Sequence, residues 1–92
     1  MGIVEVVGGV DTHADFHVAA AVDANGGVLD VERFPASVEG YEALAAWLAE
    51  LGRVMRVGVE GTGSYGVGLA CFLIDADVEV IKVDRQNRSG PA

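Results

Sequence analysis

The chain contains two apolar segments that each end in an acidic residue, and this repeated pattern constrains the fold more than any other feature. Residues 3–11 are rich in valine and end in Asp11, and residues 54–60 end in Glu60. Segments that are apolar at nearly every position are typical of strands buried on both faces of a sheet. In open α/β sheets, functional sites form at the carboxyl ends of strands. If these two strands are neighbours, Asp11 and Glu60 face one another at one edge of the sheet.

The remaining segments predict an α/β fold with a mixed sheet. Short polar turns separate the first three apolar segments, which makes them antiparallel neighbours. Ser37 is a natural N-cap, apolar residues recur at helical spacing after it, and Gly52 occupies a C-cap position. The predicted elements are strands at 3–11, 16–22 and 28–34, a helix at 38–51, a strand at 54–60, a helix at 64–75 and a strand at 78–83. This β-β-β-α-β-α-β order matches the ribonuclease-H-like fold, in which the first and fourth strands are parallel neighbours.

Length and charge limit the class of protein. The 92 residues suffice for one small domain, which we assign to residues 1–92. Six Lys and Arg against 14 Asp and Glu give a net charge of -8, which is unfavourable for non-specific binding of nucleic acid. No apolar run reaches the ~20 residues that span a bilayer, and no signal peptide opens the chain, so we expect a cytoplasmic protein without membrane contact. Cys71 falls in an apolar helical pattern and is predicted to be a buried thiol.

The two acids at the strand ends predict a metal site. Carboxylates on adjacent strand ends can hold Mg²⁺ through oxygen ligands, while water and substrate phosphate complete the octahedron. Two such ions stabilise the attacking and leaving oxygens when a phosphodiester is cleaved. Asp11 and Glu60 are therefore candidate catalytic and metal-binding residues. The alternative is that each acid simply ends a strand in contact with solvent.

The turn after Glu60 has a competing interpretation. Gly61, Gly63 and Gly66 have the G-x-G-x-x-G spacing, and Asp84 follows the next predicted strand, where a ribose-binding acid would lie. A dinucleotide would place its pyrophosphate on the N-terminus of the following helix. Glu60 places negative charge at that position, however, and the hairpins of the first 34 residues do not belong to such a fold. A plain strand-to-helix turn is the third interpretation.

Two further groups of polar residues are candidate functional sites. His13, Asp15 and His17 follow Asp11 closely enough to suggest metal ligation or proton transfer. The four Cys and His ligands of a zinc site are not present, however, and a turn with incidental histidines is the preferred interpretation. Lys82, Arg85 and Arg88 form a small basic cluster that either tracks phosphates or is a solvated tail.

Several stretches together resemble one family. These are Gly9-Val10-Asp11, the hairpin after it, Phe34-Pro35 through Gly40, Glu60-Gly61-Thr62-Gly63-Ser64-Tyr65 and Val83-Asp84-Arg85-Gln86-Asn87-Arg88. They resemble the DEDD transposases of bacterial insertion sequences, of the IS110 type, over essentially the whole chain. The N-terminal domain of that family is similar to the RuvC Holliday-junction resolvase.

The resemblance implies Mg²⁺-dependent cleavage and transfer of DNA strands, with Asp11 as the first and Glu60 as the second of four acids. The third and fourth acids lie beyond the stretch that matches, so we expect an N-terminal fragment that is inactive alone. DNA and a structured guide RNA are the implied partners. The candidate nucleic-acid contacts are Thr62, Ser64, Tyr65, Lys82, Arg85 and Arg88.

The strand order also opens the actin-like sugar kinases and ATPases, in which Gly9-Val10-Asp11-Thr12 would face ATP phosphates. That class requires a longer glycine-rich first hairpin than Thr12-His13-Ala14-Asp15 provides.

Apolar residues on the last predicted strand, such as Val80 and Ile81, would lie next to an unpaired edge, which predicts a homo-oligomer.

Overall fold

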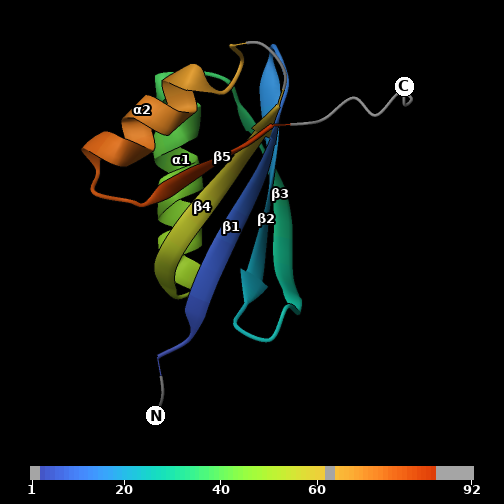
Figure 1. The fold of residues 1–92 in the computed structure, drawn as a ribbon, viewed down its shortest axis with the longest axis vertical. Coiled ribbons are helices and arrows are strands. Elements are labelled where there is room, and N and C mark those ends of the chain that lie inside the picture. The colour runs from blue at the N-terminus through green and yellow to red at the C-terminus, as the bar shows by residue number, and fades with distance from the viewer. Residues whose placement is uncertain (1–2, 62–63, 85–92) are drawn as a thin grey trace.

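The computed structural model describes residues 3–61 and 64–84, which form one five-stranded sheet and two helices (Figure 1). The mixed α/β fold predicted from the sequence is confirmed. The elements in chain order are β1 (Glu5–Thr12), β2 (Phe16–Asp23), β3 (Val28–Pro35), α1 (Val38–Leu51), β4 (Arg53–Gly61), α2 (Val67–Asp75) and β5 (Val80–Asp84).

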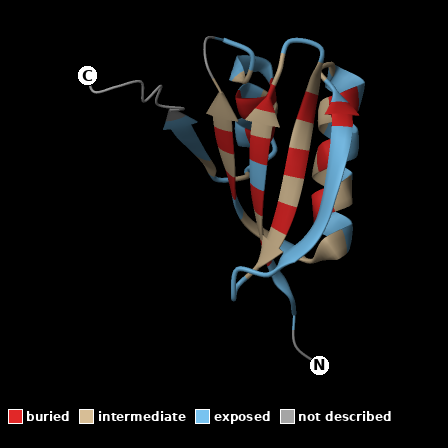
Figure 2. Ribbon diagram, turned by 90° about the vertical axis from the view of Figure 1, so that its right-hand side faces the viewer, coloured by how far each residue is buried: buried red, intermediate tan, exposed pale blue. Residues whose placement is uncertain are grey.

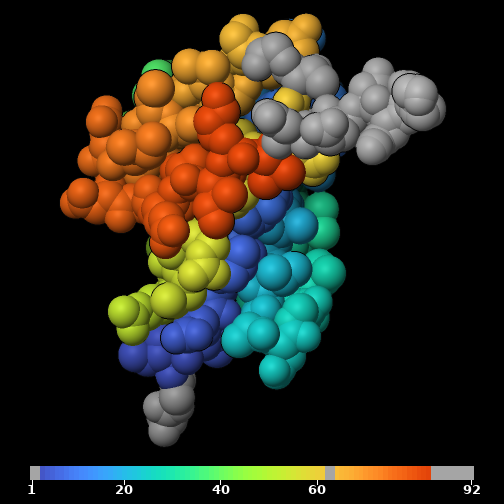
Figure 3. All heavy atoms as spheres, viewed as in Figure 1, coloured from blue at the N-terminus to red at the C-terminus, as the bar shows by residue number. Residues whose placement is uncertain are grey.

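The strand order in the sheet is β3-β2-β1-β4-β5. The hairpin strands β1, β2 and β3 pair in antiparallel fashion, whereas β4 pairs in parallel with both β1 and β5. The first and fourth strands are therefore parallel neighbours near the centre of the sheet, as predicted. In the space-filling view, the blue β1 lies between the yellow β4 and the cyan β2 (Figure 3).

Both helices pack on the same face of the sheet (Figure 1). Burial alternates along the central strands, since successive side chains of a strand point to opposite faces. On β1, Val6, Val10 and Thr12 are buried under the helices, while Asp11 on the other face is only half-buried. Figure 2 looks onto this second face, and within the described ranges no helix covers it.

The core lies between the sheet and the two helices. Leucines at four-residue spacing supply its helical side, because residues i and i+4 share one face of a helix. These are Leu44 and Leu48 on α1, and Leu69 and Leu73 on α2, all almost fully buried. They pack on small and β-branched strand residues, among them Val10, Ala19, Val57 and Val59. The close approach of large helical and small strand side chains fixes both helices on this face.

The start of α1 follows the predicted capping pattern. The Ser37 hydroxyl accepts a hydrogen bond from the Gly40 N–H at 3.1 Å, and Gly52 closes the helix with its N–H donated to the Leu48 carbonyl. Helix α2 differs from the prediction, because it begins at Val67 rather than near Ser64 and its N-cap, Gly66, offers no side chain to the first turn.

The prediction of a buried thiol at Cys71 is wrong. Cys71 is exposed on α2. It lies two residues from both Leu69 and Leu73, the two leucines of α2 that face the core. A step of two residues turns about 200° around a helix, so the thiol is directed away from the sheet.

The described part of the chain has no helix that is both long and apolar enough to cross a membrane.

Candidate functional site

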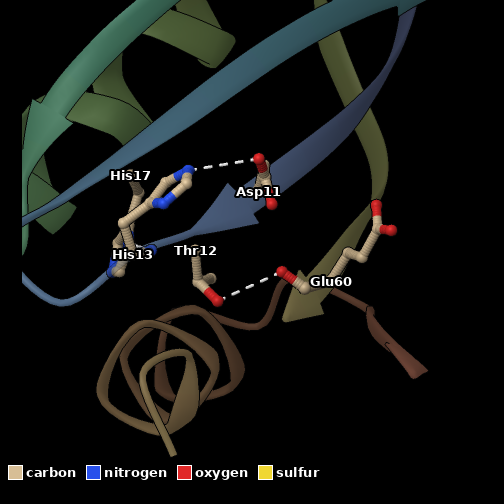
Figure 4. Close-up of polar contacts among 5 residues, drawn as sticks. All are labelled: Asp11, Thr12, His13, His17 and Glu60. Atoms are coloured by element: carbon tan, nitrogen blue, oxygen red, sulfur yellow. Dashed lines mark hydrogen bonds and ion pairs between the residues drawn. The ribbon is translucent and has the colours of Figure 1, made fainter. Parts of the chain in front are cut away.

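Asp11 and Glu60 occupy directly paired positions on the two central parallel strands. Each lies near the carboxyl end of its strand, Asp11 one residue before the end of β1 and Glu60 one residue before the end of β4. Both are half-buried and project from the face opposite the helices. The prediction that the two acids lie on adjacent strands at the same edge of one sheet is therefore confirmed, and Figure 4 shows them in close-up.

An open depression of about 370 Å³ lies on the same face and has the two acids among its lining residues. The pair Gly9 and Gly58, two positions before the acids, lacks side chains here. A Cβ on Gly9 would meet no atom within 4 Å, so this part of the depression is open. The lining residues are Gly9, Val10, Asp11, Val18, Ala20, Gly58, Glu60 and Val83. The acids thus stand beside a largely apolar hollow.

On the face covered by the helices, Thr12 links the end of β1 to the end of β4 by a hydrogen bond. Its hydroxyl donates a hydrogen bond to the carbonyl oxygen of Glu60 at 3.1 Å, and the side chain is buried (Figure 4). This hydrogen bond holds the backbone of Glu60 against β1. It therefore fixes the register of β1 and β4 at the positions of the two acids.

His13, in the turn after β1, contacts Asp11. Its Nε2 lies 3.2 Å from Asp11 Oδ2, and both side chains are about two-fifths exposed (Figure 4). The imidazole also stacks on Phe16, with ring centroids 4.7 Å apart and planes 18° from parallel. The sequence favoured a turn with incidental histidines, and this contact of His13 with Asp11 departs from that interpretation.

His17 lies on the helix side of the sheet and takes no part in the acidic pair. It is fully buried, it stacks on Tyr41 at 6.0 Å, and its Nδ1 accepts the His13 N–H at 3.3 Å. Its Nε2 is buried and finds no hydrogen-bond partner among the described residues. Burial lowers the pKa of His17 below its usual 6.5; the Phe16 backbone opposes this shift and the charge of His13 adds to it.

The glycine turn is explained by packing against Thr12. A Cβ on Gly61 would overlap the Thr12 hydroxyl, and one on Gly66 would lie 2.8 Å from a Val59 methyl and 3.1 Å from the Thr12 methyl. Both glycines thus make room for neighbouring side chains, and the space beside them is filled by the protein. Gly63 lies outside the described residues. The dinucleotide interpretation is not favoured, since the spacing is accounted for without a ligand.

The other predicted contacts are scattered. Ser64 and Tyr65 are exposed in the turn before α2. Lys82 is also exposed, but its neighbour Val83 is the residue that pairs with Glu60, so Lys82 lies on the opposite face of β5. Thr62, Arg85 and Arg88 lie outside the described residues. Within residues 3–61 and 64–84, no group of three or more His, Cys, Asp and Glu side chains is close enough to hold a metal. The candidate metal ligands in this part are the two acids.

Comparison with known proteins gives one family match and a structural likeness. A DEDD transposase model of the IS110 type, described as a transposase, matches residues 8–89. No curated protein matches the chain. Among solved structures, Pelota from Archaeoglobus fulgidus is similar in fold, with a TM-score of 0.64 at 17% identity over 92% of this chain. The chain spans only 28% of the length of that protein, and the likeness concerns the fold alone.

Proposed function

The chain belongs to the IS110-type DEDD transposase family, and from this premise we propose that it forms the N-terminal part of an RNase-H-like, RuvC-like catalytic domain. In this proposal, Asp11 and Glu60 bind a divalent cation, Mg²⁺ in the cell, for the cleavage and transfer of DNA strands. The family resemblance extends the proposal to a structured guide RNA as a second partner.

The observation that carries the proposal is the pairing of Asp11 with Glu60 on adjacent parallel strands, both on the open face. Mg²⁺ is commonly held by one or two carboxylates, with water and substrate phosphate completing its octahedron. Two half-buried carboxylates beside an open depression therefore fit the donor set that such an ion requires. A closed structural site would need more protein ligands and less access to solvent.

A bound cation would supply charge that stabilises the oxygens of a phosphodiester during displacement. The chain's own residues prepare the place for it. Asp11 and Glu60 provide the negative charge, the Thr12 hydroxyl holds the Glu60 backbone, and the small pair Gly9 and Gly58 leaves space beside the acids. The chain carries a net charge of -8, so a cation at this point also reduces repulsion of the DNA backbone.

Metal binding is tested with amide NMR spectra of the chain during titration with Mn²⁺, whose unpaired electrons broaden the signals of nearby nuclei. We expect selective broadening near Asp11 and Glu60, and its loss in Asp11→Asn and Glu60→Gln. The variant Asp15→Asn removes a charge from an exposed position in the following turn and serves as the matched control. Broadening that persists in both acid variants would contradict the metal site.

The reaction is tested in a chimera, in which this chain replaces the matched region of an active IS110-type transposase. We expect excision of the element to be retained and Asp11→Asn to abolish it, while Asp15→Asn leaves it unchanged. The chain alone is expected to show no nicking of supercoiled plasmid in Mg²⁺. An active chimera that tolerates Asp11→Asn would contradict the proposed role of the acid.

A further inference from the structure

His13 contacts the side chain of Asp11, and its own position is set by contacts on several sides. It follows the end of β1, where the chain turns into β2. Its Nε2 lies 3.2 Å from Asp11 Oδ2, which is within hydrogen-bond distance. A histidine ring in a turn is normally free to rotate. The contact with Asp11 can have a function only if other contacts hold the His13 ring in this orientation.

The backbone of His13 is held first. Its N–H points to the Phe16 carbonyl at 3.1 Å and to His17 Nδ1 at 3.3 Å. His17 is itself fully buried and packed against Tyr41 of α1, so the acceptor does not move with the turn. The turn between β1 and β2 is therefore anchored to the core through a buried imidazole.

The ring of His13 is held next. It stacks on Phe16 at 4.7 Å, and the Arg33 guanidinium lies 4.5 Å from the centroid of the same phenyl ring. Stacking on a flat aromatic ring leaves the imidazole few orientations, and the guanidinium adds a favourable cation–π contact that keeps the phenyl ring in place. With backbone and ring both fixed, Nε2 is directed at Asp11 Oδ2 (Figure 4).

We propose that His13 is a positioning residue for Asp11: its Nε2–H donates a hydrogen bond to Oδ2 and fixes the direction in which the carboxylate meets a divalent cation. This inference rests on the proposed function. Carboxylates that bind metals are commonly oriented by such outer hydrogen bonds, and the loss of one reduces metal affinity about 10- to 100-fold. His13 acts through Asp11 and does not itself touch the cation.

The test measures the affinity of the 92-residue chain for Mn²⁺ from the electron paramagnetic resonance signal of the free ion. His13→Ala is expected to weaken binding by about 10-fold or more. In His13→Gln the side-chain amide can place an N–H near the position of Nε2, so this variant is expected to recover most of the affinity. Asp15→Asn is the control in the same turn and is expected to bind as the unaltered chain does. Far-ultraviolet circular dichroism verifies that each variant is folded.

The outcomes separate the two proposals. If Asp11→Asn binds Mn²⁺ as tightly as the unaltered chain, the proposed metal site itself is wrong. If Asp11→Asn weakens binding while His13→Ala does not, the metal site stands and the positioning role is overturned. If His13→Gln is as weak as His13→Ala, the ring does not act as a hydrogen-bond donor, and the positioning role is again overturned. If His13→Ala fails to fold, the Mn²⁺ affinities of His13→Gln and Phe16→Leu test the positioning role instead. Unchanged affinity in Phe16→Leu would contradict a ring held by stacking.

Discussion

Thr12 connects the end of β1 with the end of β4 and with the glycine turn that follows β4. Its hydroxyl donates to the Glu60 carbonyl, its methyl group packs at the glycine turn, and its backbone ends β1 one residue after Asp11. The position of both acids therefore depends on a buried residue that does not belong to the proposed metal ligands. The glycine at position 61 is required because the Thr12 hydroxyl occupies the space that a larger residue would need.

We predict that Gly61→Ala destabilises the chain by about 1–3 kcal/mol, because the added methyl group overlaps the Thr12 hydroxyl and overpacks the site. Gly9→Ala is the matched control, since a methyl group there meets no atom within 4 Å and the strand tolerates alanine better than glycine. Urea unfolding measures both. The cost of Gly61→Ala should shrink in the Thr12→Ala background, and an equal cost in both backgrounds would contradict the proposed overlap.

His17 predicts a pH dependence of stability. Its pKa in the folded protein is lowered by burial below 6.5, so the unfolded chain takes up a proton at a higher pH than the folded chain. The contribution of neutral His17 to the free energy of unfolding is therefore fully present above about pH 6.5. It is lost as the pH falls from there through the lower pKa of the folded protein. NMR titration of the two histidines together with urea unfolding at pH 7.5 and 5.5 measures this effect. A His17 midpoint at or above 6.5 would contradict it.

The two helices differ in how they begin. Helix α1 has the Ser37 side-chain cap, whereas the N-cap of α2, Gly66, has no side chain, and α2 is held by Leu69 and Leu73 in the core. We predict that Ser37→Ala lowers the free energy of unfolding by about 1 kcal/mol, since the Gly40 N–H loses its acceptor. Ser64→Ala, in the exposed turn before α2, is the control and should change stability by less than about 0.5 kcal/mol. Equal effects of both substitutions would show that the cap does not stabilise α1.

At the scale of elements, the sequence predicts those features that rest on periodicity and capping. The valine-rich segments predict β1 and β4, the leucine spacing predicts α1, and the parallel pairing of the two acids follows from the order of elements. The sequence places His13 close to Asp11, but the contact itself depends on how a short turn directs the ring back over its own strand, which residue spacing alone does not show. The spacing of Gly61 and Gly66 gave no information on the side chain that fills the space between them.

The whole molecule has one face packed against helices and one face that is open in the described structure (Figure 2). Val31 on the edge strand β3, and Ile81 and Val83 on the edge strand β5, are two-fifths to one-half exposed. Exposed strand edges beside apolar side chains favour pairing with another chain, and the net charge of -8 opposes it. The apolar face lies beside the acids, so association and metal binding would occur on neighbouring surfaces.

We predict that the chain self-associates at high concentration and high salt, where charge repulsion is screened. Light scattering should then give a mass above the 9.5 kDa of one chain. Val31→Lys adds a charge to the open face and should reduce the mass, whereas Ile74→Lys adds the same charge to the exposed side of α2 and should not. A monomer under all conditions, or equal effects of the two variants, would contradict association through this face.

The proposed binding of a divalent cation by Asp11 and Glu60 can be tested with a crystal structure of the chain grown with Mn²⁺. Anomalous diffraction locates the ion independently of the protein atoms. We expect a peak within ligand distance of one carboxylate oxygen from each acid, and its absence in crystals of Asp11→Asn. A peak bound to other residues, or none near the acids at saturating Mn²⁺, would contradict the proposed site.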